Sequence, residues 1–267
     1  MAGHYERFEP DLVVRAEGGV RVVTFNRPAT MNSVTGPFHK ALAGVWPAIA
    51  EDDEARAVVL TGAGEAFSAG GDLDHIVELH EDQEMRRREG VEATEIVQSM
   101  ISCRLPVISA VNGPAVGLGC SVALFADLVY LAESAYLADP HVAIGLTAGD
   151  GGAAVWPVLA SMVQAKEYLY TGDRISAAEA VRLGLATRAV PDDELLPTAL
   201  AMAERLGNLP PQAFETTKRA LNMHLRRAVA GVLEYAAAAE FQSFDTPEHR
   251  QRFAKLRERM SRQRPGS

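Results

Sequence analysis

The 267-residue sequence predicts an α/β fold in which the loops that follow the strands gather at one end of the sheets. The first observation is a repeated order of a short apolar run, a glycine-rich loop and a helical segment. The second is that strand patterns nearly disappear after residue 160. The third is an ordinary globular composition, 48% hydrophobic and 23% charged, in a chain long enough to bury a substantial core.

Five apolar runs are predicted strands. Val20–Phe25 is rich in β-branched residues, and Ala57–Thr61 is a continuous apolar run, as expected of a strand covered on both faces. Pro106–Asn112 repeats this pattern, and Leu128–Leu131 and Ala135–Ala138 follow as shorter strands. The loops after the longer strands are therefore expected to present backbone and side chains to one site.

The last third of the chain is predicted to be helical. Helices are expected over Pro197–Leu206, Pro211–Leu225 and Ala228–Phe244, and an alanine-rich run in the last of them suits close helix packing. We therefore divide the chain into a core, residues 1–200, and a helical region, residues 201–267, that covers the core or joins subunits. No linker composition marks the boundary.

Composition and charge exclude several classes of protein. The net charge of −9 and the pI near 5.3 argue against a general surface for nucleic acid or anionic membranes. Cys103 and Cys120 lie beside apolar runs without metal-ligand spacing, so we expect reduced, buried thiols and no bound metal. The N-terminus lacks a signal-peptide pattern, and the longest apolar segment, Val116–Ala132, is interrupted by glycines and Asp127. A cytoplasmic protein that binds neither nucleic acid nor membranes is expected.

The stretch from Glu78 to Glu92 is strongly charged and is predicted to be an exposed helix or loop. His75 and His80 fall in a charged helix that we expect to be exposed, and we assign them no role. The segment from residue 74 to 100 and the C-terminal helices are expected to supply the walls of any pocket.

Three glycine-rich loops carry the candidate chemistry: Phe67–Leu73, Asn112–Gly119 and Ala138–Gly152. The third loop places His141 nine residues before Asp150. Imidazole titrates near neutral pH, and a carboxylate on its far nitrogen would fix its tautomer and stabilise the imidazolium. Asp150 is a candidate for that carboxylate, or for a second proton carrier that faces the substrate. The loops together predict a site that binds a polarised carbonyl and moves protons beside it.

The order and spacing of several motifs resemble those of the crotonase (enoyl-CoA hydratase/isomerase) superfamily over nearly the whole chain. The motifs are Asn26-Arg-Pro with Asn32, the loop Phe67–Leu73, Ala110-Val-Asn-Gly-Pro with its glycines, Asp127, and Thr171-Gly-Asp with a helix expected over Ser176–Gly184. The resemblance implies a crotonase-like spiral of β-β-α repeats with a C-terminal helical trimerisation region. It also implies an acyl-CoA thioester substrate and assembly as a homotrimer or a dimer of trimers.

The resemblance further implies that two backbone amides form an oxyanion hole. Where the family has these donors, this sequence has Gly71 in the first loop and Leu118 in the second. Reactions at an acyl thioester pass through an enolate or a tetrahedral oxyanion, which backbone N–H groups in a water-poor site stabilise. The glycines beside these positions allow the backbone to approach closely.

Other residues are implied to bind the coenzyme A part of the substrate. They are Ala69, Gly70, Asp72 and Leu73 of the first loop, and Arg259, which lies roughly where family members place a basic residue toward a phosphate from a neighbouring subunit. Asp72 also suits the start of a helix, where a carboxylate pairs with free N–H groups. No cofactor is expected beyond the coenzyme A of the substrate.

The acid–base residues depart from the pattern of the family. Well-known hydratases use two glutamates, at positions that are Ser121 and His141 in this sequence. Asp150 matches the catalytic aspartate of dienoyl-CoA isomerases. The His141 and Asp150 loop also resembles that of 6-oxocamphor hydrolase, a crotonase homologue that cleaves a carbon–carbon bond of a β-diketone without coenzyme A. Ser121 is interpreted as structural, because a hydroxyl without a partner is a poor general base.

We therefore predict an acyl-CoA-processing enzyme of the enoyl-CoA hydratase/isomerase type. Gly71 and Leu118 would stabilise a thioester enolate, with His141 as general base and Asp150 as its orienter or as an acid. Two alternatives stay open. One is a hydrolase that cleaves a carbon–carbon bond of a β-diketone or β-keto substrate, and the other is a non-catalytic paralogue that binds acyl-CoA.

Overall fold

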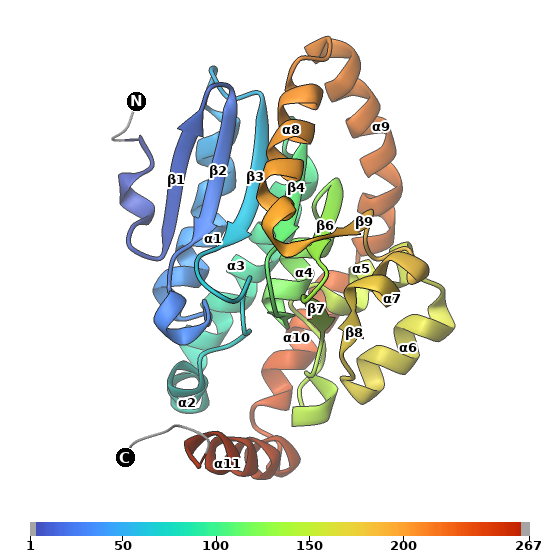
Figure 1. The fold of residues 1–267 in the computed structure, drawn as a ribbon. Helices are drawn as coiled ribbons and strands as arrows, with labels where there is room; N and C mark the ends of the chain where they lie inside the picture. Colours follow the sequence, from blue (N-terminus) through green and yellow to red (C-terminus); the bar gives the residue numbers. More distant parts are fainter. Residues whose placement is uncertain (1–3, 263–267) are drawn as a thin grey trace.

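A six-stranded sheet in the order β1-β2-β3-β4-β6-β9 dominates one side of the computed structural model, which describes residues 4–262 (Figure 1). The strands are β1 (Leu12–Glu17), β2 (Val20–Phe25), β3 (Ala57–Gly62), β4 (Val107–Val111), β6 (Leu128–Ala132) and β9 (Arg188–Val190). β1 and β2 form an antiparallel hairpin, and the pairs from β2 onward are parallel. Because these strands run in one direction, the loops that follow them meet at one edge of the sheet.

A smaller sheet in the order β5-β7-β8 lies beside that edge. Its strands are β5 (Ala115–Val116), β7 (Tyr136–Ala138) and β8 (Ile175–Ser176). β4 leads into β5 and then a helix, and β6 leads into β7 and then a helix. An isolated bridge from Ser68 to Ala115 joins the first loop to this sheet, and a second bridge joins Gly71 of that loop to Val34, just before α1. The expected spiral of β-β-α repeats is confirmed.

Helices cover both sheets and make up most of the C-terminal third, as predicted. They are α1 (Gly36–Ala50), α2 (Leu73–Glu81), α3 (Gln83–Ser102), α4 (Leu118–Leu124), α5 (Gly152–Leu159), α6 (Met162–Thr171), α7 (Ala177–Leu183), α8 (Leu195–Gly207), α9 (Pro211–Val229), α10 (Val232–Ser243) and α11 (Pro247–Ser261). Short 3-10 turns are η2 (Glu6–Phe8), η3 (Pro28–Thr30), η4 (Val142–Ile144) and η5 (Asp192–Glu194). None of the helices within residues 4–262 combines the length and apolar character needed to cross a membrane.

Capping residues define several helix ends. The Asp72 carboxylate accepts from two amides at the start of α2, and Ser176 accepts from the Glu179 amide at the start of α7. Gly184 ends α7 in the left-handed conformation, which costs glycine little. Residue 200, where the sequence suggests a boundary, lies inside α8, and α8 packs on β2, β3 and β4.

The main core lies between the large sheet and the helices that cover it. Its largest fully buried side chains include Trp46 of α1, Trp156 of α5 and Tyr130 of β6. The β3 run is buried at every position but its last, Gly62, as its continuous apolar sequence predicts. The core fixes β3, β4 and β6, and these strands fix the loops at their ends.

The charged stretch from Glu78 to Glu92 is helical, but the expectation that His75 and His80 lie in an exposed helix is wrong. His75 is only 8% exposed, and its ring nitrogens contact Glu78 at 2.8 Å and Glu89 at 2.7 Å. His80 is half-buried and contacts the buried His249 of α11. The composition of a segment reports its average polarity, whereas one face of α2 is covered by α3 and α11.

A buried lysine attaches α9 to the sheet. Lys218 is 6% exposed, and its Nζ donates to the Leu105 carbonyl at 2.6 Å and to Asp127 Oδ2 at 2.6 Å. Asp127 Oδ2 also accepts from the Val107 amide at the start of β4, at 2.8 Å. One carboxylate oxygen therefore joins a helix of the C-terminal third to a central strand.

We expect Lys218→Ala to lower the free energy of unfolding by roughly 2–3 kcal/mol, because it leaves the Leu105 carbonyl and the Asp127 carboxylate without their cation. Urea unfolding measures this as a lower midpoint at an unchanged slope. Lys166→Ala, at an exposed position on α6, is the control and should change stability by less than about 0.5 kcal/mol. Equal midpoints for the two variants would contradict the structural role of Lys218.

Candidate active site

The three glycine-rich loops predicted from the sequence lie side by side. The first contacts the second through the Val116 amide, which donates to the Ser68 carbonyl at 2.9 Å. Gly70 lies so close to the second loop that a Cβ on it would be 3.1 Å from the Val116 carbonyl oxygen. The second loop contacts the third through the Gly117 amide, which donates to the Ala138 carbonyl at 3.0 Å. Backbone contacts thus assemble one site from segments 70 residues apart.

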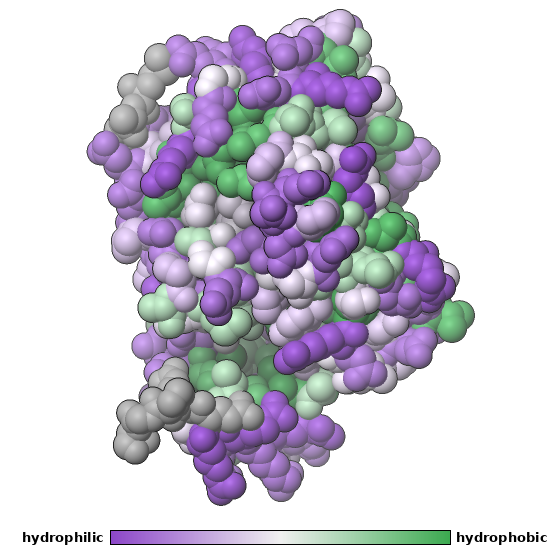
Figure 2. Space-filling model, viewed as in Figure 1, coloured by the Kyte–Doolittle hydropathy of each residue, from purple (hydrophilic) through white to green (hydrophobic). Residues whose placement is uncertain are grey.

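These loops and helices α2, α3, α10 and α11 enclose a cavity of about 1380 Å³. Figure 2 shows hydrophobic side chains in the hollow between α11, at the lower edge of the view, and the body of the molecule. All the residues that the sequence analysis selected for the site line this cavity: Ala69, Gly70, Gly71, Asp72, Leu73, Leu118, His141, Asp150 and Arg259.

The amides of Gly71 and Leu118 are available as donors. Among residues 4–262, neither amide donates to a backbone or side-chain acceptor. Leu118 is the first residue of α4, whose N-cap, Gly117, has φ of 55° and no capping side chain. A helix start leaves its first amides unpaired, and their partial positive charge favours an anion. Gly71 is exposed, and it lies on the same cavity.

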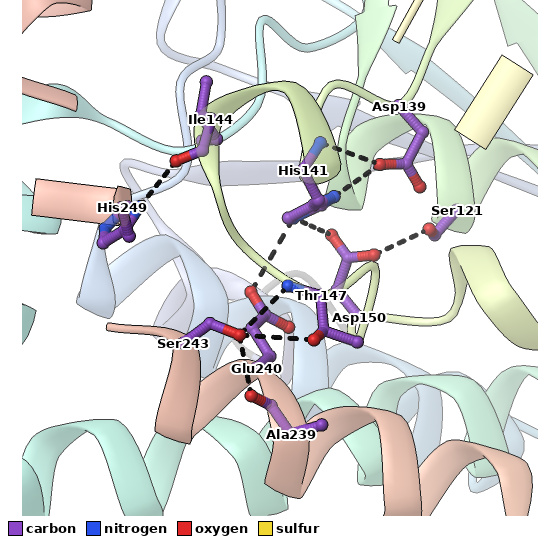
Figure 3. A network of polar contacts seen from close by, with 10 residues as sticks. All are labelled: Ser121, Asp139, His141, Ile144, Thr147, Asp150, Ala239, Glu240, Ser243 and His249. Atoms are coloured by element: carbon purple, nitrogen blue, oxygen red, sulfur yellow. Dashed lines mark hydrogen bonds and ion pairs between the residues drawn. The ribbon is translucent and has the colours of Figure 1, made fainter. Parts of the chain in front are cut away.

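His141 lies among three carboxyl groups (Figure 3). Its Nδ1 is 2.5 Å from Asp139 Oδ1, while its Nε2 is 3.4 Å from Asp150 Oδ2 and 3.7 Å from Glu240 Oε1. Asp150 contacts Nε2, on the cavity side of the His141 ring. Of the two roles left open for Asp150, this geometry favours that of a proton carrier that faces the cavity. The carboxylate that holds the far nitrogen is Asp139.

Sequence reasoning missed Asp139 and Glu240. Asp139 precedes Pro140-His141 directly, so its position two residues before the histidine was a usable signal. Glu240 follows an alanine-rich run of α10 and belongs to no motif, so only the packing of α10 against α5 brings it to the site. Ser121 also has a partner, because its Oγ donates to Asp150 Oδ1 at 3.0 Å.

Glycines leave the space that these carboxyl groups occupy. A Cβ on Gly152 would be 2.1 Å from Asp139 Oδ2, and a Cβ on Gly149 would be 2.5 Å from Glu240 Oε2. Contacts this short are not possible, so any side chain at either position would displace a carboxyl group. The glycines of the third loop are therefore required by the charged cluster as well as by the turn.

The cluster favours an imidazolium at His141. Burial alone would lower the pKa of His141, but the charges of Asp150 and Asp139 and the hydrogen bond to Asp139 outweigh it, and the pKa lies well above its usual value. Burial raises the pKa of Glu240 to about 8, so this carboxyl group is mostly protonated at pH 7. Burial also raises the pKa of Asp150, although His141 and the Ser121 hydroxyl stabilise its charged form. A general base acts as the neutral imidazole, so the raised pKa makes His141 less suited to that role.

One group of side chains within residues 4–262 has the spacing of metal ligands. It consists of Asp139, His141 and Asp150, each of which offers one ligand atom within 4.8 Å of the others. The 2.5 Å separation of His141 Nδ1 and Asp139 Oδ1 is that of a hydrogen bond, which requires a proton on the line between them. The Asp139 carboxylate therefore orients the His141 ring and directs its Nε2 toward Asp150. We interpret the cluster as a proton-transfer group.

Asp72 and Arg259, two of the residues expected to bind coenzyme A, lie in different surroundings. The Asp72 carboxylate caps α2 and accepts from Ser33 Oγ at 2.9 Å, so it is used within the fold. Arg259 is exposed on α11 and lines the cavity of its own chain. The family resemblance implies instead that such a residue reaches the coenzyme A phosphate from a neighbouring subunit.

Comparison with known proteins shows similarity over most of the chain. Residues 15–262 match the family model described as enoyl-CoA hydratase/isomerase. A short-chain-enoyl-CoA hydratase of Clostridium acetobutylicum is 32% identical over 241 residues, which cover 90% of this chain and 92% of that protein. A crystal structure of an enoyl-CoA hydratase/isomerase from Mycobacterium paratuberculosis is 51% identical, with a TM-score of 0.89 over 92% of this chain and 98% of that one. A beta-diketone hydrolase from the cyanobacterium Anabaena is 26% identical, with a TM-score of 0.83 over 90% and 96% of the two chains.

We expect the His141 ring to carry two protons at pH 7, while His249, whose pKa is lowered mainly by burial, carries one. Nitrogen-15 NMR of the imidazole rings distinguishes these states directly. Asp139→Asn should lower the pKa of His141, because it removes one of the carboxylates that stabilise the cation. A His141 ring that is neutral at pH 7 in the unaltered protein would contradict this electrostatic account.

Proposed function

Because the chain belongs to the enoyl-CoA hydratase/isomerase family, we propose that it transfers protons at an acyl-CoA thioester whose carbonyl is held by the Gly71 and Leu118 amides. The observation that carries the proposal is one cavity that joins two free backbone donors to a buried proton-transfer cluster. Membership of the family supports a reaction of the hydratase/isomerase class. The buried cluster around His141 supports the proposal that its side chains carry the proton transfer.

The thioester carbonyl oxygen accepts from the two amides, and they stabilise the negative charge that forms on it when the substrate becomes an enolate. A Cβ on Gly117, next to Leu118, would be 3.4 Å from His141 Cε1. The proton-transfer cluster therefore lies directly beside the proposed oxyanion hole. Substrate carbons next to the carbonyl would face the cluster.

The cluster contains both a proton acceptor and a proton donor. Asp150 is the acceptor, because burial makes its carboxylate more basic while His141 keeps it charged. Glu240 is the donor, because burial keeps it protonated near neutral pH. His141 lies between the two as the cation that couples them, oriented by Asp139. This arrangement replaces the two glutamates of the well-known hydratases, and it assigns the base to Asp150 instead of His141.

The coenzyme A part of the substrate is proposed to lie along the first loop and toward α11. The backbone of Ala69 and Gly70 lines the cavity beside Gly71. Lys255, Arg257 and Arg259 of α11 also line it and bring positive charge to the cavity of a protein whose net charge is −9. Phosphate groups favour such cations.

We expect His141→Ala and Asp150→Asn each to lower kcat on the active enoyl-CoA by about 10² to 10⁴, because each removes a group that acts in proton transfer. KM should change much less, because the amides that hold the carbonyl remain. Steady-state kinetics on a series of enoyl-CoA thioesters, starting with crotonyl-CoA, measures both constants. His224→Ala, at an exposed position on α9, is the control and should retain normal turnover.

Two outcomes would contradict the proposed function. Near-normal turnover by both the His141 and Asp150 variants would place the chemistry elsewhere. Cleavage of a β-diketone panel by the unaltered protein, without turnover of any thioester, would instead favour the carbon–carbon bond hydrolase.

The pH dependence tests the role of Glu240. Below pH 8 its carboxyl group holds a proton, and above pH 8 the proton is lost, so kcat/KM should fall as pH rises through about 8. The descending limb should be absent in Glu240→Gln, whose plateau should be lower at all pH values. Glu204→Gln, on the exposed face of α8, should keep the limb. A limb that persists unchanged in Glu240→Gln would exclude Glu240 as the titrating group.

A further inference from the structure

The segment between His141 and Asp150 is held from outside by α10 and α11 (Figure 3). Four hydrogen bonds cross this boundary. Ser243 Oγ accepts from the Thr147 amide at 3.3 Å and lies 3.2 Å from Thr147 Oγ1. Arg252 Nη1 donates to the Ala143 carbonyl at 3.1 Å, and His249 Nδ1 lies 2.8 Å from the Ile144 carbonyl oxygen. Of the α10 and α11 side chains in these contacts, Ser243, Arg252 and His249, only His249 is fully buried, at 0% exposure.

The hydrogen bonds of His249 define its protonation. A carbonyl oxygen only accepts, so Nδ1 of His249 carries a proton and donates to Ile144. Nε2 of His249 is 2.8 Å from Nε2 of His80, and a neutral His249 accepts there from the His80 N–H. Both ring nitrogens are therefore used, and each has a defined role.

The Ile144 peptide is in turn connected to the catalytic residues. The amides of Ile144 and Leu146 both donate to the His141 carbonyl, at 3.1 Å and 2.8 Å. Next to Ile144, Gly145 has φ of 83°, and a Cβ on it would be 2.9 Å from His249 Cα. The first turn of α11 is thus in direct contact with the turn that begins at His141.

We propose that His249 is a positioning residue, which holds the Ile144 carbonyl and thereby fixes the turn that places His141 beside Asp150. His80 orients the His249 ring. The inference rests on the proposed function of His141 and Asp150, although the hydrogen bonds that carry it do not depend on that function. His249 does not line the cavity, so it acts through the loop and not on the substrate.

The surroundings of the two histidines agree with neutral rings. Burial lowers the pKa of His249. Burial also lowers the pKa of His80 to about 4, together with the positive charges of Arg250 and Arg86 and against the opposing charge of Asp245. The rings of Phe244 and Phe253 enclose the pair. A buried imidazole is costly unless its nitrogens are hydrogen-bonded, so packing alone would be served better by an apolar ring.

The test separates the hydrogen bond from the packing. His249→Phe keeps an aromatic ring and removes the donor, whereas His249→Asn restores an N–H near the position of Nδ1. Phe253→Leu perturbs the same aromatic cluster without removing a polar contact and is the matched control. For each variant we would measure kcat and KM on the active thioester, and hydrogen exchange of the Leu146 amide, which bonds to the His141 carbonyl.

We expect His249→Phe to lower kcat by about 10- to 100-fold with little change in KM, since misplacement of a catalytic group reduces turnover more than binding. Exchange at Leu146 should accelerate about tenfold or more. His249→Asn should recover most of both properties, and Phe253→Leu should leave both within about twofold. Unchanged kcat and exchange in a folded His249→Phe protein would overturn the inference, as would an equal loss in Phe253→Leu.

If His249→Phe does not fold, His80→Leu decides the question, because it removes the donor that orients His249. It should lower kcat and accelerate Leu146 exchange in the same direction, and no change in either would overturn the inference. Hydrogen exchange also separates this inference from the proposed function. A protein without thioester activity would refute the function, while the exchange rates of the variants would still test the role of His249.

Discussion

The carboxyl groups of Asp139, Asp150 and Glu240 all lie within 3.7 Å of a His141 nitrogen, in a space with little access to water. Like charges so close together would strongly disfavour ionisation of all three. The imidazolium of His141 and the proton on Glu240 make the arrangement possible, and the glycines of the third loop leave room for it. The electrostatic balance of this cluster therefore depends on the charge of one ring.

Sequence patterns predicted those parts of the site that are local. The resemblance to the crotonase superfamily selected the Gly71 and Leu118 amides in two glycine-rich loops, and His141 and Asp150 share a third loop. Glu240 and His249 reach the site from helices about 100 residues away, and neither helix carries a motif. Their selection requires the packing of α10 and α11, which the sequence does not specify by itself.

The five predicted strands match β2, β3, β4, β6 and β7, which are apolar runs buried at most positions. The sequence did not predict β1 and β9, which are more exposed and lack such a run. The histidines of α2 were misjudged for the opposite reason. His75 and His80 lie in a stretch whose average composition is polar, but their burial depends on the neighbouring helices α3 and α11. The C-terminal third was correctly expected to be helical. In addition, it supplies Glu240 to the charged cluster, Arg259 to the cavity wall and His249 to the turn that begins at His141.

The two amides that face the cavity belong to the main chain, and this has a consequence for how such a protein can diversify. Under the proposed function, a substitution at position 141, 150 or 240 changes which protons can move, but it leaves N–H groups at positions 71 and 118 in place. Recognition of the carbonyl and choice of reaction are thus encoded in different parts of the polypeptide. New chemistry can arise by exchange of a few side chains on an inherited backbone, without a simultaneous loss of the older ability to bind the substrate.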